Sequence, residues 1–175
     1  MSTTTATSDE TRREFRNAMA HLSAAVNVLT TSDDDGPRGI TVSAVCSVTD
    51  EPPTVLVCVN RSSSSHEALR NSERVGVNVL SGDHTDVARH FAGMTKLPMD
   101  ERFASHAWEF QDGVPLLSDA VVTLAGRVRH VTEQGTHSVM FVEVEDVRVR
   151  PENGGLVYFD RQFHRLGSPA PEVAS

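Results

Sequence analysis

The chain has 175 residues, 38% of them hydrophobic and 23% charged, which fits a single domain with a sizeable apolar core. Its formal net charge of −8 argues against nucleic acid or an anionic membrane as the main partner, because both require a basic face. No apolar run approaches the length of a transmembrane span and the N-terminus lacks an apolar signal core, so we expect a cytoplasmic protein.

Both ends of the chain consist mainly of small and polar residues. Residues 1–10 and 167–175 are therefore predicted to be flexible, with one folded domain over residues 11–166. The first element of that domain is a predicted helix, because four apolar residues recur at positions i, i+3, i+4 and i+7. These residues are Phe15, Ala18, Met19 and Leu22. Thr7 and Glu10 have the spacing of a capping box at its start.

Segments with a β pattern dominate the rest of the chain. They cover residues 25–31, 40–48, 54–60 and 75–80, followed by two long strands at 120–131 and 138–150. Asp33–Pro37 predicts a solvated hairpin tip rather than a cation site, because no further oxygen ligands follow at loop spacing. Glu51–Pro53 predicts a break between two strands, because proline cannot donate to a ladder.

The apolar positions of the last long strand change phase. Val142 and Val144 share one parity, whereas Val147 and Val149 take the other. Glu145–Asp146 therefore predicts a β-bulge that bends the strand. Long bent strands in a chain with few helices favour a mainly β fold with peripheral helices, closed into a barrel.

Helices are few in this pattern. A short helix is predicted to begin inside the serine run at 62–65, and another to cover residues 85–92. Residues 93–118 are expected to be mostly loop and short helix, with a break at Val114–Pro115. Because no regular crossover helices separate the strands, a doubly wound α/β fold is not expected.

Several familiar motifs are absent from the sequence. No G-x-G-x-x-G follows a strand, and there is no P-loop, H-E-x-x-H or G-x-S-x-G. The eight histidines and two cysteines lack metal-ligand spacing, so no metal site is expected. Cys46 and Cys58 lie in apolar runs and are predicted to be buried, reduced thiols. His84 and His90 are expected to be exposed or hydrogen-bonded rather than ligands.

Two segments are candidates for ligand contact. Residues 60–67 join a strand end to a helix start, where hydroxyls and free N–H groups can bind a phosphate without net positive charge. Ser64 and Glu67 have capping-box spacing, and composition alone favours a plain polar connector there. Residues 39–48 alternate small and hydroxyl side chains, which either lets a flat ring lie against the backbone or fills a tight barrel.

Seven segments, in one order, carry a resemblance to a known family. They are Phe15-Arg16-x-Ala18-Met19, AVNVLTT at 25–31, GITVSAVCSVTDEPPTVLVCVN at 39–60, VNVL at 77–80, ARHFAGM at 88–94, Gly135-Thr136-His137 and LVYFDRQFH at 156–164. From about Phe15 to Leu166 the chain resembles the flavin reductase domain family, most closely the reductase components of two-component 4-hydroxyphenylacetate 3-monooxygenases.

The resemblance implies a split β-barrel of the FMN-binding type, assembled as a homodimer with the flavin near the subunit interface. It implies that seven residues line the isoalloxazine ring: Thr41, Val42, Ser43, Ala44, Cys46, Ser47 and Val48. It also implies that Asn60, Ser63 and Ser65 surround the ribityl chain and phosphate, with Phe91 at the flavin site. Many relatives have threonine where this chain has Ser65, a difference that keeps the hydroxyl.

The resemblance also implies a site for the nicotinamide dinucleotide. Many relatives carry Gly-Asp-His where this chain has Gly135–His137, so the histidine transfers but the acidic neighbour does not. His137 is the candidate for contacting the dinucleotide. Arg161 is a second candidate near its phosphates, and a surface salt bridge is an equal alternative for that side chain.

The implied function is hydride transfer from NADH, or NADPH, to FAD or FMN, with the reduced flavin released to a partner monooxygenase such as 4-hydroxyphenylacetate 3-monooxygenase. Because this chemistry belongs to the cofactors, no catalytic acid, base or nucleophile is expected in the protein. Two alternatives stay open. One is a split-barrel flavoprotein that keeps its flavin bound and reduces another acceptor, and the other is a non-enzymatic flavin- or haem-binding module.

Overall fold

The computed structural model describes residues 8–150 and 154–167. Its largest sheet has seven antiparallel strands in the order β3-β2-β6-β9-β10-β5-β4. Their bounds are β2 Asn27–Asp33, β3 Gly36–Val42, β4 Val45–Asp50, β5 Pro53–Asn60, β6 Arg74–Val79, β9 Val122–Gln134 and β10 His137–Val149. Smaller sheets contain β1 Ala24–Ala25, β11 Gly155–Phe159 and β12 Gln162–Leu166, and the hairpin of β7 Trp108–Gln111 and β8 Val114–Leu117. The helices are α1 Asp9–Ala20, α2 His66–Asn71, α3 Thr85–Phe91 and α4 Met99–Ala104.

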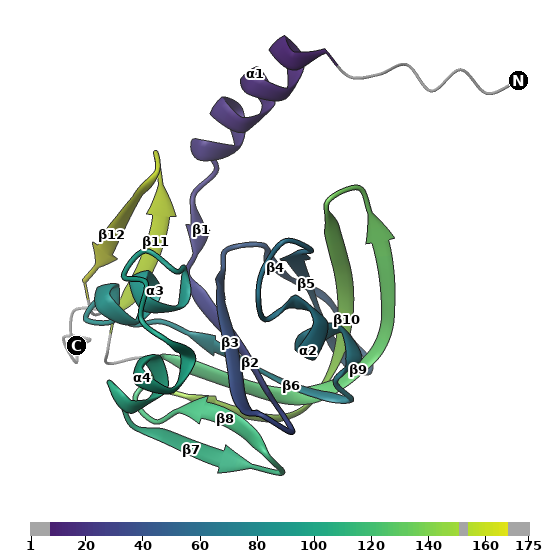
Figure 1. Ribbon diagram of the computed structural model, residues 1–175, viewed down its shortest axis with the longest axis vertical. Coiled ribbons are helices and arrows are strands. Elements are labelled where there is room, and N and C mark those ends of the chain that lie inside the picture. The colour runs from purple at the N-terminus through teal and green to yellow at the C-terminus, as the bar shows by residue number, and fades with distance from the viewer. Residues whose placement is uncertain (1–7, 151–153, 168–175) are drawn as a thin grey trace, which may run out of the picture.

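The large sheet curls into an incomplete barrel (Figure 1). Among the described strands, β3 and β4 at its two ends do not pair with each other, so the closed barrel expected from the strand pattern is wrong and the split barrel fits. The single strand predicted for residues 40–48 is also wrong, because the chain leaves the ladder at Ser43 and Ala44. There the N–H of Val45 donates to the carbonyl of Ser43 at 3.1 Å, a tight turn that sends β4 to the opposite end of the sheet.

The predicted bulge in the last long strand is confirmed. Val144 pairs with Gly126 and Asp146 with Ala125, which leaves Glu145 unpaired. A Cβ on Gly126 would lie 2.2 Å from the carbonyl oxygen of Glu143, so only glycine allows the two strands to approach here. β9 extends to Gln134 instead of ending at the predicted residue 131, so the β9–β10 hairpin reaches beyond the rest of the barrel (Figure 1).

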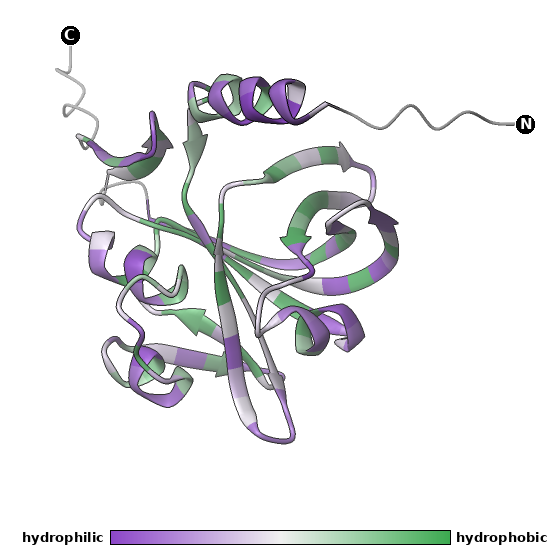
Figure 2. Cartoon of the chain, turned by 45° about the horizontal axis from the view of Figure 1, so that its top comes forward, coloured by the Kyte–Doolittle hydropathy of each residue, from purple (hydrophilic) through white to green (hydrophobic). Residues whose placement is uncertain are grey.

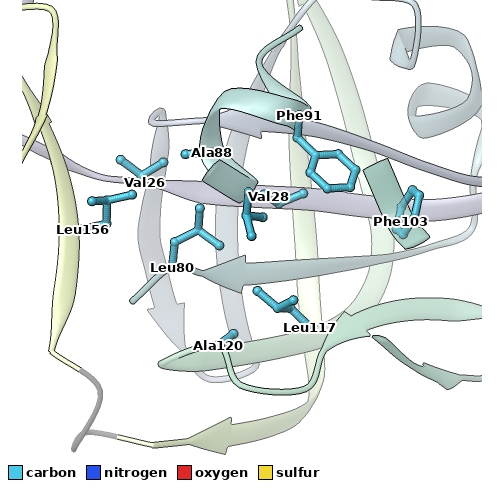
Figure 3. Close-up of a cluster of buried hydrophobic side chains, with 10 residues drawn as sticks. Val26, Val28, Leu80, Ala88, Phe91, Phe103, Leu117, Ala120 and Leu156 are labelled. Carbon is cyan, nitrogen blue, oxygen red and sulfur yellow. The ribbon is translucent and has the colours of Figure 1, made fainter. Parts of the chain in front are cut away.

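Apolar clusters cover both faces of the sheet. The cluster inside the barrel includes Leu29, Val57, Val77, Leu69 of α2 and Met140. The other cluster lies between the sheet and the helices α3 and α4, and includes Val28, Leu80, Phe91, Phe103 and Leu117 (Figure 3). Successive residues Val28 and Leu29 of β2 point to different clusters, so this strand is buried on both faces.

Several local predictions need correction. Ser8 caps α1, with its Oγ accepting from the N–H of Thr11 at 3.1 Å, and Thr7 lies outside the described residues. The flexible ends predicted for the chain fall mostly outside the described residues, although Asp9 and Glu10 form the first turn of α1. Residues 93–118 contain the β7–β8 hairpin as well as α4, and Pro115 lies within β8. A two-stranded hairpin tolerates this proline because only alternate residues of a strand donate to one neighbour.

α1 projects away from the barrel (Figures 1 and 2). It is joined to the β11–β12 turn, where Arg161 Nη2 donates to Asn17 Oδ1 at 2.6 Å. The predicted apolar face exists but nothing in the described chain covers it: Phe15, Met19 and Leu22 are 62%, 44% and 64% exposed. No described helix combines the length and apolar character needed to cross a membrane.

Candidate functional site

Four of the residues predicted to contact flavin meet in one cavity of about 280 Å³, here called the serine cavity. Its walls are β3, the loop between β5 and α2, the C-terminal end of α3, and α4. Its lining consists of Gly39, Ile40, Asn60, Ser62, Ser63, Ser64, Ser65, Phe91, Ala92, Gly93 and Arg102. The structure therefore brings Phe91 of α3 together with Asn60, Ser63 and Ser65, which lie in one segment between β5 and α2.

The loop in this cavity uses most of its own N–H groups. Asn60 Oδ1 accepts from the N–H of Ser62 at 2.9 Å, and its carbonyl accepts from the N–H of Ser63 at 3.1 Å. Ser63 accepts from Ser65 through Oγ and from His66 through its carbonyl. Consecutive tight turns therefore use the N–H groups of Ser62, Ser63, Ser65 and His66, so the helix start has fewer free donors than expected.

Ser65 and Gly39 fasten this loop to β3. Ser65 is buried and its Oγ donates to the Gly39 carbonyl at 2.9 Å, so it does not cap α2 and the predicted Ser64–Glu67 capping box is absent. A Cβ on Gly39 would lie 2.8 Å from the ring of Phe91, which packs against Phe103 with centroids 4.9 Å apart. Phe91 is only 2% exposed, so it is a core residue whose ring edge closes the cavity.

Arg102 is a cavity residue that the sequence did not reveal. It is the one basic side chain in the lining of the serine cavity, and its Nε donates to the Leu97 carbonyl at 2.7 Å. No described residue accepts from its two Nη groups. In an acidic chain, a local cation of this kind favours an anionic ligand beside Ser63. A basic residue in the last turn of a short helix is too common a feature to mark a site in the sequence.

The residues predicted to line the flavin ring divide into two groups. Thr41 donates to the Ala88 carbonyl at 2.7 Å and Val42 lies in the core, so both side chains support β3. The exposed group consists of Ser43, Ala44, Cys46, Ser47 and Val48. Of these, Ser43, Ala44 and Cys46 line a second cavity of about 480 Å³ beside β1. Because β4 is an edge strand, its backbone also presents polar groups that no described strand pairs with.

The predicted burial of both cysteines is wrong. Cys46 is exposed on the edge strand and Cys58 is half-buried on the neighbouring strand. Val57 and Val59 take the inward positions of β5, which leaves Cys58 on the outer face. Burial raises the pKa of the Cys58 thiol, with a smaller contribution from Cys46, so Cys58 stays protonated at neutral pH.

His137 lines a larger cavity of about 1190 Å³, here called the arginine cavity. It lies between α1, the β9–β10 turn and residues 61–65, the loop between β5 and α2 that is here called the serine loop. Its lining consists of Thr11, Arg12, Phe15, Arg16, Asn60, Arg61, Ser62, His66, Gly135, Thr136 and His137. His137 pairs with Asn60 across β10 and β5, and Asn60 lines both this cavity and the serine cavity. Arg161 does not join them: it lies on the β11–β12 turn, across the barrel from the β9–β10 turn (Figure 1).

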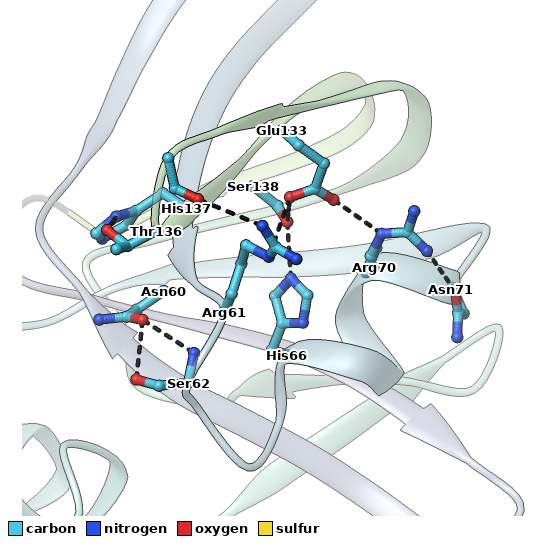
Figure 4. Close-up of polar contacts among 11 residues, drawn as sticks. Asn60, Arg61, Ser62, His66, Arg70, Asn71, Glu133, Thr136, His137 and Ser138 are labelled. Atoms are coloured by element: carbon cyan, nitrogen blue, oxygen red, sulfur yellow. Dashed lines mark hydrogen bonds and ion pairs between the residues drawn. The ribbon is translucent and has the colours of Figure 1, made fainter. Parts of the chain in front are cut away.

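A polar network lies behind the arginine cavity (Figure 4). The buried Ser138 donates to Glu133 Oε2 at 2.9 Å and therefore accepts, at 2.7 Å, from a protonated Nε2 of His66. Arg70 donates to Glu133 Oε1 at 2.9 Å, and Arg61 Nε lies 3.6 Å from Oε2. Arg70 and then Ser138 hold the pKa of Glu133 below its ordinary value. The network ties the start of α2 to the start of β10, and no sequence spacing revealed it.

The remaining titratable groups show no metal-binding arrangement. Among the described residues, no group of three or more His, Cys, Asp or Glu side chains could hold a metal ion. His84 is buried, and its Nδ1 accepts from the N–H of Ser81 at 3.1 Å. His90 Nδ1 lies 2.9 Å from Thr95 Oγ1, so both histidines are hydrogen-bonded as expected.

Comparison with known proteins agrees with this geometry. Residues 19–167 match the family described as flavin reductase like domain. A 4-hydroxyphenylacetate 3-monooxygenase reductase component from Pseudomonas aeruginosa is 55% identical over 159 residues, which cover 90% of this chain and 94% of that protein. An FMN reductase (NADH) RutF from Pantoea ananatis is 45% identical, over 89% of this chain and 81% of its own. The structure of a Streptomyces globisporus NADH:FAD oxidoreductase, SgcE6, in complex with NAD and FAD fragments has a TM-score of 0.82 at 27% identity, covering 97% and 99% of the two chains. The resemblance seen in seven segments is thereby confirmed, and the chain belongs to the flavin reductase like domain family.

Proposed function

We propose that this chain is an NAD(P)H-dependent flavin reductase and the reductase component of a two-component monooxygenase. The observation that carries the proposal is the meeting of the serine and arginine cavities at Asn60. Hydride transfer requires two ligands held in contact, and adjoining cavities fit that need. The names of two relatives, a monooxygenase reductase component and an FMN reductase (NADH), support the same reaction.

The flavin, FMN or FAD, occupies the serine cavity in this proposal. Its phosphate lies against Ser63 and Arg102, and its ribityl chain against Asn60. The ring extends towards the exposed small residues Ser43 and Ala44, where the chain leaves the ladder. Small side chains at this point leave room for a flat ring, and the unpaired backbone of β4 offers it N–H donors.

The flavin supplies the hydride acceptor, and the residues of this chain bind and orient the two ligands. His137 lines the arginine cavity, pairs directly with Asn60 across β10 and β5, and positions the nicotinamide in this proposal. N–H donors along the edge of β4 would face a bound ring and could hold negative charge there. Among the described residues, the serine cavity has one cation in its lining, which fits a flavin that is released to an oxygenase rather than held permanently.

The chain assembles as a homodimer in this proposal, and α1 supplies part of the interface. Its apolar face is uncovered in the described chain, and Val147 and Val149 of the bulged strand are also exposed. Obligate dimers bury roughly 2,000 Å² or more of total accessible surface, and their interfaces are more apolar than those of transient complexes. Light scattering is expected to show a dimer at working concentration, and a fully active monomer would contradict the assignment.

The partner proposed for the reduced flavin is a 4-hydroxyphenylacetate 3-monooxygenase oxygenase component, which follows from the 55% identical relative.

The deciding experiment is NADH oxidation by the purified protein with and without added FMN and FAD. Turnover that depends on added flavin supports the proposal. A protein that purifies yellow and reduces another acceptor without added flavin would favour a bound prosthetic group, and no NADH oxidation at all would favour a binding module.

A further inference from the structure

The arginine cavity has a charge opposite to that of the whole chain. Among the described residues, its lining contains three arginines and two histidines but no aspartate or glutamate, whereas the chain carries a net charge of −8. The arginines are Arg12 and Arg16 on α1 and Arg61 on the serine loop. Because the chain as a whole is acidic, a cavity lined by arginines indicates a ligand of opposite charge. The chemical class that fits this cavity is a multiply charged anion.

We propose that the arginine cavity binds the pyrophosphate of the nicotinamide dinucleotide, with Arg61 and Arg16 as its main ligands and Glu133 as a counter-ion that Arg61 leaves on binding. This inference rests on the proposed function, because it names where one of the two substrates places its phosphates. His137 opens into the same cavity, so the pyrophosphate and the nicotinamide lie on one continuous surface.

The backbone of Arg61 is fixed while its guanidinium is free to move. The N–H of Arg61 donates to the Thr136 carbonyl at 2.9 Å, which anchors the residue next to His137. Its side chain is 54% exposed and makes two long contacts, with the Gly135 carbonyl at 3.3 Å and Glu133 at 3.6 Å. Contacts of this length at the surface are worth little, so a phosphate that offers two short oxygen partners displaces them.

Glu133 does not line the cavity but stands behind Arg61. Arg70 and Ser138 hold the carboxylate at 2.9 Å each, so it keeps partners when Arg61 leaves. The carboxylate therefore competes with the incoming anion for Arg61 without being left unpaired. This competition weakens dinucleotide binding, as suits an enzyme whose oxidised product must depart.

The other cations stand across the cavity on α1. Arg12 and Arg16 are four residues apart and therefore share one helix face. Arg12 is paired with Asp9, whereas Arg16 makes no hydrogen bond or ion pair with any residue that the structure describes. Arg13, on the same helix, is exposed and lies outside the lining, which makes it a matched control.

The first test compares NADH with reduced nicotinamide riboside, a hydride donor that has no phosphate. Arg61→Gln and Arg16→Gln are each expected to raise the KM for NADH about tenfold, the loss of one charge-assisted bond, and to leave the KM for the riboside unchanged. Arg13→Gln should change neither. An equal rise for both donors, or no rise for NADH, would overturn the inference.

The second test uses Glu133→Gln, for which the proposal predicts a gain. Removing the competing carboxylate is expected to lower the KM for NADH about two- to fivefold, the worth of an exposed ion pair, with no change for the riboside. A purely structural Glu133 would instead raise the KM for both donors and lower the melting temperature. That result would remove Glu133 from the proposal.

The third test is independent of catalysis. Calorimetry with ADP-ribose, which carries the pyrophosphate but no nicotinamide, should show binding to the wild-type chain that Arg61→Gln weakens about tenfold. Binding that is absent or unaffected by Arg61→Gln overturns the inference even if the chain reduces flavin. Arginine-dependent binding without any flavin reduction would sustain the inference and refute the proposed function.

Discussion

The serine cavity and the arginine cavity share Asn60, but they are built differently. The serine cavity has a volume of about 280 Å³ and is walled by buried groups, such as Phe91 and Ser65, whose contacts are already made. The arginine cavity has a volume of about 1190 Å³, its three arginines are exposed, and Arg61 is held by two long contacts only. A preformed pocket of small groups recognises shape and one phosphate, whereas mobile guanidiniums recognise charge. If the two cavities serve two different ligands, a variant in one cavity should change the binding of one substrate and not of the other.

The largest expected effect separates Ser63 from Ser65 in the serine cavity. Ser63→Ala should weaken FMN binding by one charge-assisted bond, about 10- to 100-fold, and leave riboflavin binding unchanged. Ser65→Ala should weaken both flavins and lower the melting temperature, because it leaves the Gly39 carbonyl without its donor. Fluorescence titration and a melting curve measure these outcomes. Unchanged FMN affinity in both variants would contradict the placement of the flavin phosphate in this cavity.

Arg102 gives the next largest expected effect. Arg102→Gln should weaken FMN binding about tenfold while riboflavin binding and NADH KM stay constant, because only the flavin phosphate meets this cation. Arg102→Lys should restore part of the loss. Arg89→Gln, an exposed position on α3 outside the lining, is the matched control. A loss shared equally by riboflavin would show that Arg102 holds the loop rather than the phosphate.

His137→Ala tests the arginine cavity in the same way. If His137 positions the nicotinamide, the variant should raise the KM for NADH or lower kcat severalfold, with flavin affinity nearly constant. Steady-state kinetics with each substrate varied, together with a melting curve, measures the split. Normal NADH kinetics in a stable variant would exclude His137 from the site. Altered kinetic constants for both substrates, together with a lower melting temperature, would show that His137 only stabilises the β9–β10 turn.

The smallest expected effect concerns pH and the network behind the arginine cavity. Because the pKa of Glu133 is lowered in the folded chain, its stabilisation is present above the ordinary value of 4.5 and is lost as pH falls through the folded value. The melting temperature of the wild-type chain should therefore fall more steeply below about pH 4.5 than that of Glu133→Gln. Parallel melting curves would show that these exposed ion pairs contribute nothing measurable.

The sequence by itself determined the features that depend on local pattern. The phase change in β10 predicted the bulge at Glu145, and the acidic hairpin tip after β2 lies where the turn composition indicated. Seven ordered segments predicted the family, which the match over residues 19–167 confirms. Such features follow from alternation, turn chemistry and motif order, all of which are properties of neighbouring residues.

Only the tertiary structure decided the contacts between segments that are far apart in the sequence. Arg102 enters the serine cavity because α4 packs beside β3, and Glu133 meets Arg70 because β9 and α2 lie side by side. The turns of the serine loop decide which of its N–H groups already donate a hydrogen bond within the loop, and these turns are seen only in the structure. The open sheet and the uncovered face of α1 are likewise properties of packing. Local preferences select elements, but contacts between elements far apart in the chain decide which side chains share a cavity.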